Sequence, residues 1–253
     1  MPKIELVKED RSQLVLKSNE IIRQARYDMT APQQKAYLFL ISKIKPGDKA
    51  NTVYEFHTSR FLRSCGLTDA GENYKAVLDI LLTIGRVRFW VPIDGKLTLL
   101  GLVNTVTVDT DSSIIYCTFH EQIQPYLLNL QKNYTIYELT NVLAMRSKYA
   151  IRFYEIAKSY QYLGTFTLTP DEIKDMLGAK YEEYRDIKRR VIKPAVEEIN
   201  ALTDIDVSFE EITENRKVLS VKFSVGLKDY DEQWLAEKER ERIYGKNTET
   251  DRG

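Results

Sequence analysis

The amino-acid sequence predicts an α+β fold built as a tandem duplication of winged-helix domains, each a helix-turn-helix followed by a β-hairpin. The order helix, short strand, helix, helix and strand hairpin occurs twice, about 112 residues apart. Gly66 and Gly178 end equivalent helices in the two copies. The chain of 253 residues is 43% apolar, which is enough for two hydrophobic cores. We therefore expect an N-terminal winged-helix domain at 1–130, a C-terminal one at 131–227 and a charged tail at 228–253.

The first copy begins with a possible strand at 13–17 and a short helix that Ser18 caps. A stronger helix signal follows, because Thr30 is a typical N-cap, Pro32 lies in the first turn, and Gln33 stands three residues after the cap. The apolar run 34–44 continues this helix. A strand is expected at 53–56 and a helix at 58–65. A further helix at 73–84 should bury Val77, Leu78, Leu81 and Leu82.

Strands complete the first copy. The alternation of Thr and Val within 103–108 is typical of a strand, and the pair Asp94-Gly95 is typical of a hairpin turn. We expect strands at 87–91, 97–109 and 114–119, then a helix at 121–130 that leads into a connector.

The second copy opens with a strong helix signal at 147–162, and a short strand at 165–168 follows. Thr169 and Glu172 have the spacing of a capping box, which predicts a helix that Gly178 ends. A long helix at 181–202 precedes two strands at 205–212 and 218–226, with a turn at Asn215. The tail is expected to be a solvated helix or disordered. The apolar positions of the first helix that should be buried are Ile151, Tyr154, Ile156 and Ala157.

The strongest functional signal is the basic segment 185–193, which holds five bases and one acid. On a helix over 184–202, an apolar stripe would face inward, formed by Ile187, Val191, Ala195 and Ile199. The bases would face outward: Arg185, Arg189 and Lys193 lie four residues apart, and Lys188 and Arg190 flank them.

The charge order of this helix opposes its dipole. Cations near a helix N-terminus cost roughly 0.3–1 kcal/mol each, and here the acids Glu197 and Glu198 come late. An external polyanion that meets the N-terminal half would explain the arrangement, because a recognition helix presents its first turns to base edges and phosphates. A solvated charged face is the alternative. Pro194 removes one helical hydrogen bond, so we expect a bend there.

Two weaker candidates for DNA contact exist. The equivalent helix of the first copy begins with Asn73, Tyr74 and Lys75, for which dimer packing is the competing interpretation. Arg216 and Lys217 lie at the tip of the second hairpin, where a phosphate contact and an ordinary solvated turn are equally open.

Composition limits the remaining functions. Acids and bases balance at 37 each, which argues against polyanion binding over the whole surface. The two cysteines form no metal or redox motif, and neither an apolar run of membrane-spanning length nor a signal peptide is visible. We expect a cytoplasmic protein that has no metal, cofactor or membrane association. His57 and His120 do not form the His-x-His site of a rolling-circle nickase, and there is no phosphate-binding loop, so we expect no enzyme.

Four segments of the chain are similar to the plasmid replication initiators of the iteron-binding Rep family. They are VLKSNEII at 15–22, QQKAY at 33–37, SKYAIRFYE at 147–155 and KRRVIKPAVEEIN at 188–200. The resemblance covers about residues 13–227. It implies two winged-helix domains and binding to direct repeats (iterons) in double-stranded origin DNA. It also implies a monomer–dimer switch in which dimers repress the initiator's own promoter, and contacts with the host initiator and the replicative helicase.

By match to the family's recognition-helix motif, the resemblance assigns DNA contact to Arg185, Lys188, Arg189, Arg190 and Lys193, and Pro194 fits the same motif. We therefore expect sequence-specific binding to origin repeats that initiates plasmid replication, with dimerisation and auxiliary DNA contact in the first domain. Two alternatives remain open. One is a winged-helix transcriptional repressor without initiator activity, and the other is a protein that uses winged helices to bind proteins.

Overall fold

The computed structural model describes residues 13–26, 28–45, 47–49, 51–67, 73–93, 96–128, 130 and 132–249, and it forms two compact units. The division lies between Leu143 and Ala144, later than the expected boundary at 130/131. The reason is a strand in the expected connector, β7 (Tyr134–Glu138), which pairs antiparallel with β1 (Leu14–Ser18) and so belongs to the first unit.

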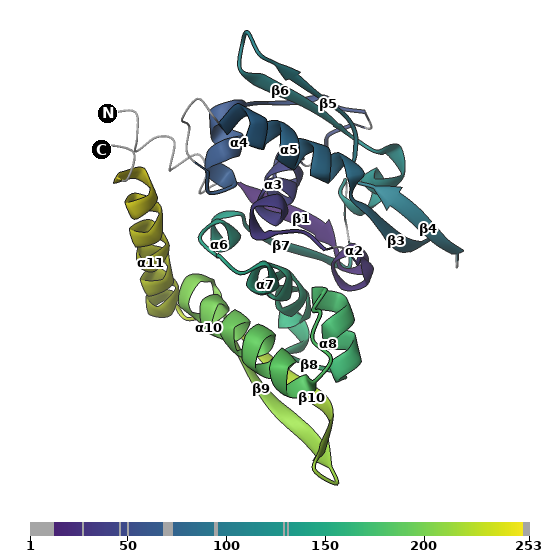
Figure 1. Cartoon of the computed structure of the whole chain (residues 1–253), viewed down its shortest axis with the longest axis vertical. Coiled ribbons are helices and arrows are strands. Elements are labelled where there is room, and N and C mark those ends of the chain that lie inside the picture. Colours follow the sequence, from purple (N-terminus) through teal and green to yellow (C-terminus); the bar gives the residue numbers. More distant parts are fainter. Residues whose placement is uncertain are drawn as a thin grey trace. The chain divides into compact units, whose positions relative to one another are not determined.

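The first unit repeats the predicted order of elements and adds others around it (Figure 1). Its three-stranded sheet has the order β2-β6-β5, while β3 and β4 form a separate ribbon. Besides β1 and β7, the elements are α2 (Asn19–Gln24), α3 (Ala31–Ile41), β2 (Tyr54–His57), α4 (Thr58–Ser64), α5 (Asn73–Arg86), β3 (Arg88–Ile93), β4 (Lys96–Gly101), β5 (Val103–Asp109), β6 (Ile114–Phe119), the 3-10 helix η1 (Glu121–Tyr126) and α6 (Thr140–Leu143).

Local signals place the helix starts of the first unit as predicted. The Ser18 hydroxyl accepts the Ile21 amide at 3.3 Å, and Gln33 Oε1 accepts the Thr30 amide at 2.9 Å. Gly66 closes α4 with a φ of 75°, a left-handed conformation that suits glycine. Phe39 of α3 packs edge-on against Phe56 of β2, with ring centroids 5.1 Å apart, which joins the helices to the sheet.

Three expectations for the first unit were wrong. In α5, Val77 and Leu81 are buried as predicted, but Leu78 is 42% and Leu82 52% exposed. The helix instead buries Ile80 and Ile84, because its apolar pattern is broader than the face that packs. The single strand expected at 97–109 is split at Leu102, which leaves β4 in the ribbon and β5 in the sheet. The helix expected at 121–130 is the short 3-10 helix η1, which contains Pro125.

The second unit has the winged-helix order without insertions. Its sheet has the order β8-β10-β9, so the first strand pairs with the third as it does in the first unit, which confirms the tandem duplication. The elements are α7 (Lys148–Tyr160), the 3-10 helix η2 (Gln161–Leu163), β8 (Thr165–Leu168), α8 (Pro170–Leu177), α9 (Tyr184–Ile187), the π-helical turn η3 (Lys188–Ile192), α10 (Lys193–Leu202), β9 (Ile205–Glu214), β10 (Lys217–Leu227) and α11 (Tyr230–Glu249).

The core of the second unit lies between α7 and the sheet. The four predicted apolar positions of α7 are buried, and Phe153 packs against Phe223 of β10 at 4.9 Å between ring centroids. Thr169 and Glu172 form the predicted capping box at the start of α8, and Gly178 ends that helix in the left-handed conformation. Most of the predicted tail forms the helix α11, in which Ala236 is buried.

Candidate nucleic-acid interface

The predicted recognition helix is continuous from α9 through η3 to α10, and we call residues 184–202 the basic helix. A π-helical turn precedes Pro194, with the Lys193 amide donating to the Lys188 carbonyl five residues back. Proline lacks an amide hydrogen and its ring crowds the carbonyl four residues earlier, which is that of Arg190. The wider π turn accommodates both effects, so the helix continues instead of breaking.

Burial separates the two faces of the basic helix as predicted. The inward stripe is fully packed: Ile187, Val191, Ala195 and Ile199 are all buried. On the opposite side Lys188 is half-buried, and the other four bases of the segment, Arg185, Arg189, Arg190 and Lys193, are exposed. The sheet and α7 therefore hold the helix by its apolar face and leave the cationic face to solvent.

Asp186 organises two of the exposed arginines. Its Oδ1 atom accepts a hydrogen bond from Arg189 Nη2 at 2.8 Å and forms an ion pair with Arg190 Nε at 3.5 Å. Arg190 also lies over the ring of Tyr181, 5.5 Å from its centroid. The hydrogen bond from Arg189 holds the pKa of Asp186 below its ordinary value, so this carboxylate stays ionised at neutral pH.

Lys188 is tied to the hairpin instead. Its Nζ atom lies 2.8 Å from Glu211 Oε1 on β9, and the Tyr184 hydroxyl donates to the same oxygen at 2.7 Å. The hydrogen bond from Lys188 lowers the pKa of Glu211, and burial together with Glu211 raises the pKa of Tyr184. These contacts join the N-terminal half of the basic helix to the first strand of the hairpin.

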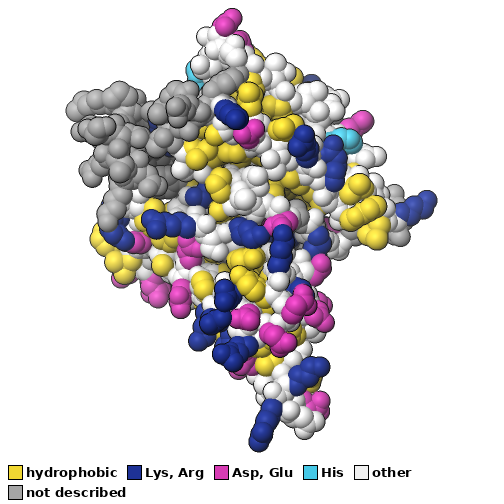
Figure 2. Space-filling view, in the orientation of Figure 1, with side chains coloured by type: hydrophobic (Ala, Val, Ile, Leu, Met, Phe, Trp, Pro, Cys, Tyr) yellow, Lys and Arg dark blue, Asp and Glu magenta, His cyan; other side chains and the backbone are white. Residues whose placement is uncertain are grey.

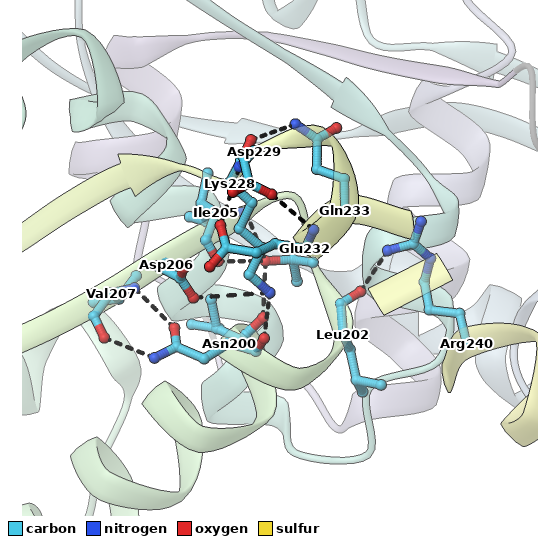
Figure 3. Close-up of polar contacts among 12 residues, drawn as sticks. Asn200, Leu202, Ile205, Asp206, Val207, Lys228, Asp229, Glu232, Gln233 and Arg240 are labelled. Carbon is cyan, nitrogen blue, oxygen red and sulfur yellow. Dashed lines mark hydrogen bonds and ion pairs between the residues drawn. The ribbon is translucent and has the colours of Figure 1, made fainter. Parts of the chain in front are cut away.

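The opposite end of the basic helix is also anchored to the hairpin, as Figure 3 shows. The Asn200 side chain exchanges two hydrogen bonds with the Val207 backbone of β9, at 2.8 and 2.9 Å. Lys228 donates to the Asn200 carbonyl, and Arg240 of α11 donates to the Leu202 carbonyl at 2.7 Å. Cationic donors at a helix C-terminus satisfy its last carbonyls and suit the dipole.

The tip of the β9–β10 hairpin presents the other two predicted bases of this unit. Asn215 and Arg216 have φ angles of 49° and 65°, the signature of a two-residue type I′ turn. Arg216 and Lys217 are exposed, and neither has an ion pair among the described residues. Figure 2 shows lysine and arginine side chains, with acids among them, on the part of the second unit formed by the basic helix and the hairpin.

The equivalent face of the first unit is less basic. Asn73 and Tyr74 begin α5, but their side chains lie outside the described part of the chain; Lys75 is exposed. Asp109 ends β5 and Asp111 lies in the turn to β6, and the Asp109 carboxylate accepts hydrogen bonds from that turn. The wing of this unit is therefore acidic where that of the second unit is basic.

The first unit has an exposed apolar surface on its β3–β4 ribbon. Trp90 pairs directly with Leu99, and Leu97 lies two residues away on the same face. These three side chains, the apolar ribbon face, are 53%, 49% and 71% exposed, while Phe89 and Leu100 on the other face are buried. An exposed apolar cluster of this kind is typical of a protein-contact surface.

Sequence reasoning missed the partners that organise the bases. Asp186 stands three and four residues before Arg189 and Arg190, a spacing that brings side chains together on a helix, so this signal was readable. Glu211 could not be found in the same way, because its position depends on strand register. Glu198 also has a structural role that we missed: its carboxylate accepts the Arg146 and Ser147 amides at 2.5 and 3.1 Å, before α7.

The described residues lack two other kinds of site. They contain no group of three or more His, Cys, Asp or Glu side chains placed to hold a metal ion. No helix in the described ranges is long and apolar enough to cross a membrane.

Comparison with known proteins identifies the family. Residues 14–158 match the family described as "Initiator Replication protein, WH1", and residues 169–225 match "Initiator Rep protein, WH2". A probable replication protein rep from Bifidobacterium longum (strain NCC 2705) is 23% identical over 202 residues, which cover 78% of this chain and 67% of the relative.

One solved structure shares the architecture. The Pi initiator protein, determined in complex with iteron DNA, has a TM-score of 0.71 at 19% identity, covering 87% of this chain and 99% of that one. Domains 2 and 3 of RctB have a TM-score of 0.47 at 12% identity, covering 79% of this chain and 82% of that one. The two family matches span both copies of the duplicated unit, and the chain therefore belongs to the family of initiator replication proteins.

Proposed function

We propose that this protein binds direct repeats (iterons) in double-stranded origin DNA and thereby initiates plasmid replication. One observation carries the proposal: the helix that precedes the wing presents four exposed bases and the half-buried Lys188 opposite an apolar stripe that is fully buried. Membership of the initiator family supports initiation over repression alone. The iteron complex of the Pi initiator protein, which has the same fold, supports the choice of DNA ligand.

The bases of the second unit divide into two roles. Arg185 and Arg189 lie in the first turns of the basic helix, where a guanidinium can fork onto guanine in the major groove. Arg190 and Lys193 neutralise phosphates, as do Arg216 and Lys217 at the hairpin tip, and Lys188 contributes less because it is paired with Glu211. The type I′ turn supports this role for the tip, because Arg216 lies in the turn and Lys217 in the last strand pair next to it, and both are exposed.

We propose self-association and auxiliary DNA contact for the first unit. The apolar ribbon face supports self-association, since its three exposed side chains lie on one side of a two-stranded ribbon. Lys75, with Asn73 and Tyr74 beside it on α5, is the candidate for the auxiliary contact. Autorepression by the dimer and contacts with the host initiator and helicase are further proposals that follow from the family resemblance. We also propose that the protein acts in the cytoplasm and catalyses no reaction.

The test compares the full-length protein on a duplex carrying its own upstream direct repeats with a scrambled duplex, over a range of salt concentrations. The variants are Arg185→Ala and Arg189→Ala, and Arg242→Ala on α11 is the control for loss of one exposed cation. We expect each of the first two variants to lose about 1–3 kcal/mol of binding to the repeats. The control should bind like the wild type, and all four proteins should have the same melting temperature.

Equal binding of the wild type to both duplexes would overturn sequence-specific recognition of that DNA. Full repeat binding by the Arg185 and Arg189 variants would overturn the site. Initiation is separated from repression by a replication assay on a plasmid that carries the repeats and lacks another initiator. A protein that binds the repeats and silences their promoter, yet supports no replication, would be a repressor.

A further inference from the structure

Asp186 is the single acid within the basic segment 185–193, and it lies in the first turn of the basic helix. An acid at this position of a DNA-facing helix weakens binding to every duplex, because it approaches the phosphates. First-turn acids do stabilise a helix through its dipole, so a purely structural role is the competing explanation. The contacts of the carboxylate distinguish the two explanations.

The two oxygens of Asp186 differ. Oδ1 receives both arginine contacts, from Arg189 Nη2 at 2.8 Å and Arg190 Nε at 3.5 Å. Oδ2 accepts no hydrogen bond among the described residues, and the side chain is 40% exposed. Asp186 thus orients an arginine through Oδ1 and leaves Oδ2 available as an acceptor on the same turn.

We propose that Asp186 determines sequence specificity by accepting a hydrogen bond from the amino group of a cytosine in the repeat while it positions Arg189 for a guanine. This inference rests on the proposed DNA-binding function of the basic helix. A guanidinium has five N–H donors, so Arg189 retains donors for guanine O6 and N7 after it bonds to Asp186. The free Oδ2 is complementary to the cytosine N4 amino group, which is the donor that acidic side chains read in the major groove.

The same carboxylate excludes guanine and thymine, whereas adenine also offers an amino donor, at N6. An ionised carboxylate is an acceptor only, whereas guanine presents O6 and N7 and thymine presents O4, all of which are acceptors. Their approach to Oδ2 would place two acceptors together without a proton. Asp186 therefore lowers the affinity for all DNA but increases discrimination at one base pair, because its carboxylate repels the acceptors of the wrong bases.

The experiment measures the dissociation constants of the full-length protein for the repeat, for every single-base-pair substitution of the repeat, and for a scrambled duplex. Asp186→Asn is compared with the wild type, because the amide keeps the shape but can also donate to guanine O6 or thymine O4. Glu197→Gln is the matched control, since it removes one negative charge from an exposed position on the same helix. Melting temperatures verify that the three proteins are equally folded.

We expect the wild type to prefer cytosine over guanine and thymine at one position by about 10-fold or more. Asp186→Asn should reduce that preference to about 2-fold, retain discrimination at the other positions, and bind the scrambled duplex more tightly. Glu197→Gln should retain the cytosine preference. An unchanged substitution profile for Asp186→Asn, or the same change in both variants, would overturn the role of Asp186 alone. A wild type that does not distinguish the repeat from the scrambled duplex would overturn the proposed function itself.

Discussion

Lys188 and Lys193 are both bases of the same helix, yet the structure predicts that they contribute differently to the salt dependence of DNA binding. Lys193 is exposed and has no ion pair among the described residues, although its charge helps to lower the pKa of Glu211 by longer-range electrostatic attraction. Lys188 lies 2.8 Å from Glu211, which already neutralises it. We therefore compare Lys193→Ala, Lys188→Ala and Glu211→Gln.

The expected magnitudes follow from counterion release. Each phosphate that a base neutralises adds about 0.9 to the slope of log affinity against log salt. Lys193→Ala should lower the slope by that amount, so between about 50 and 200 mM salt the wild type should lose about 3.5-fold more affinity than the variant. Lys188→Ala should lower the slope by less than half as much, because it removes a base whose charge is already compensated. Glu211→Gln should raise the slope by up to about 0.9, since it frees Lys188 for phosphate.

The assay is fluorescence anisotropy of a labelled repeat duplex titrated at four or more salt concentrations. Stability does not confound it, since partly exposed ion pairs contribute only about 0–1 kcal/mol. Equal slope changes for Lys188→Ala and Lys193→Ala would refute the reasoning, and so would a Glu211→Gln variant with the wild-type slope. Equal slope changes would mean that Lys188 leaves Glu211 for a phosphate in the complex. A wild-type slope for Glu211→Gln would mean that Glu211 does not control that contact.

Four further outcomes are expected. The folded pKa of Glu211 is depressed, so its stabilisation is present above the ordinary value of 4.5 and is lost as pH falls through the folded pKa; the difference in melting temperature between wild type and Glu211→Gln should shrink on acidification. Ile199→Ala should lower the free energy of unfolding by about 2–5 kcal/mol in denaturant titrations, because Ile199 is fully buried. Thr169→Ala should cost about 0.5–2 kcal/mol in the same titrations through loss of the capping box. Leu97→Lys should shift sedimentation toward the monomer, and an unchanged distribution would exclude the apolar ribbon face from self-association.

Much of the fold was predictable where the signal is local. Thr169 and Glu172 satisfy each other within one turn of helix, and Gly66 and Gly178 adopt the left-handed conformation that ends a helix. Asn215 marks a turn whose geometry few residues adopt. Each of these signals depends on a residue's own conformation or on a partner a few positions away, so the surrounding fold cannot easily override it.

Features that depend on distant partners were not predictable. The strand β7 is stabilised by pairing with β1, and Thr135 donates to Asn19 from 116 positions away. Its aromatic and β-branched residues favour a strand, but its alternation of apolar and polar residues is weak, and we expected a connector there. The prediction that Leu78 and Leu82 of α5 are buried was wrong for a related reason. Leu78 and Leu82 are as apolar as Val77 and Leu81, and only the packed partners decide which stripe is buried.

The candidate site divides in the same way. The inward and outward stripes of the basic helix follow from helical periodicity, and burial agrees with them. The periodicity could not reveal the π turn. This turn widens the helix to five-residue hydrogen bonds between Lys188 and Lys193, next to Pro194, which disturbs the normal bonding. Nor could it reveal Glu211, since the pairing of this acid with Lys188 requires β9 to lie beside the helix.

The neutral net charge of the chain is compatible with DNA binding because of where its acids are used. Residues 184–217 contain seven bases and eight acids, which would suggest repulsion of a polyanion. Four of these acids, however, have partners outside that segment. Asp204, Asp206 and Glu210 form ion pairs with Lys158, Lys228 and Lys222, and Glu198 accepts amides before α7.

Seven bases then face four acids on the basic helix and hairpin. One of those four acids, Asp186, is shared by two arginines, and another, Glu211, holds a single lysine. The field that an approaching duplex meets depends on this local excess, because charges farther away than about 8 Å are screened at physiological salt.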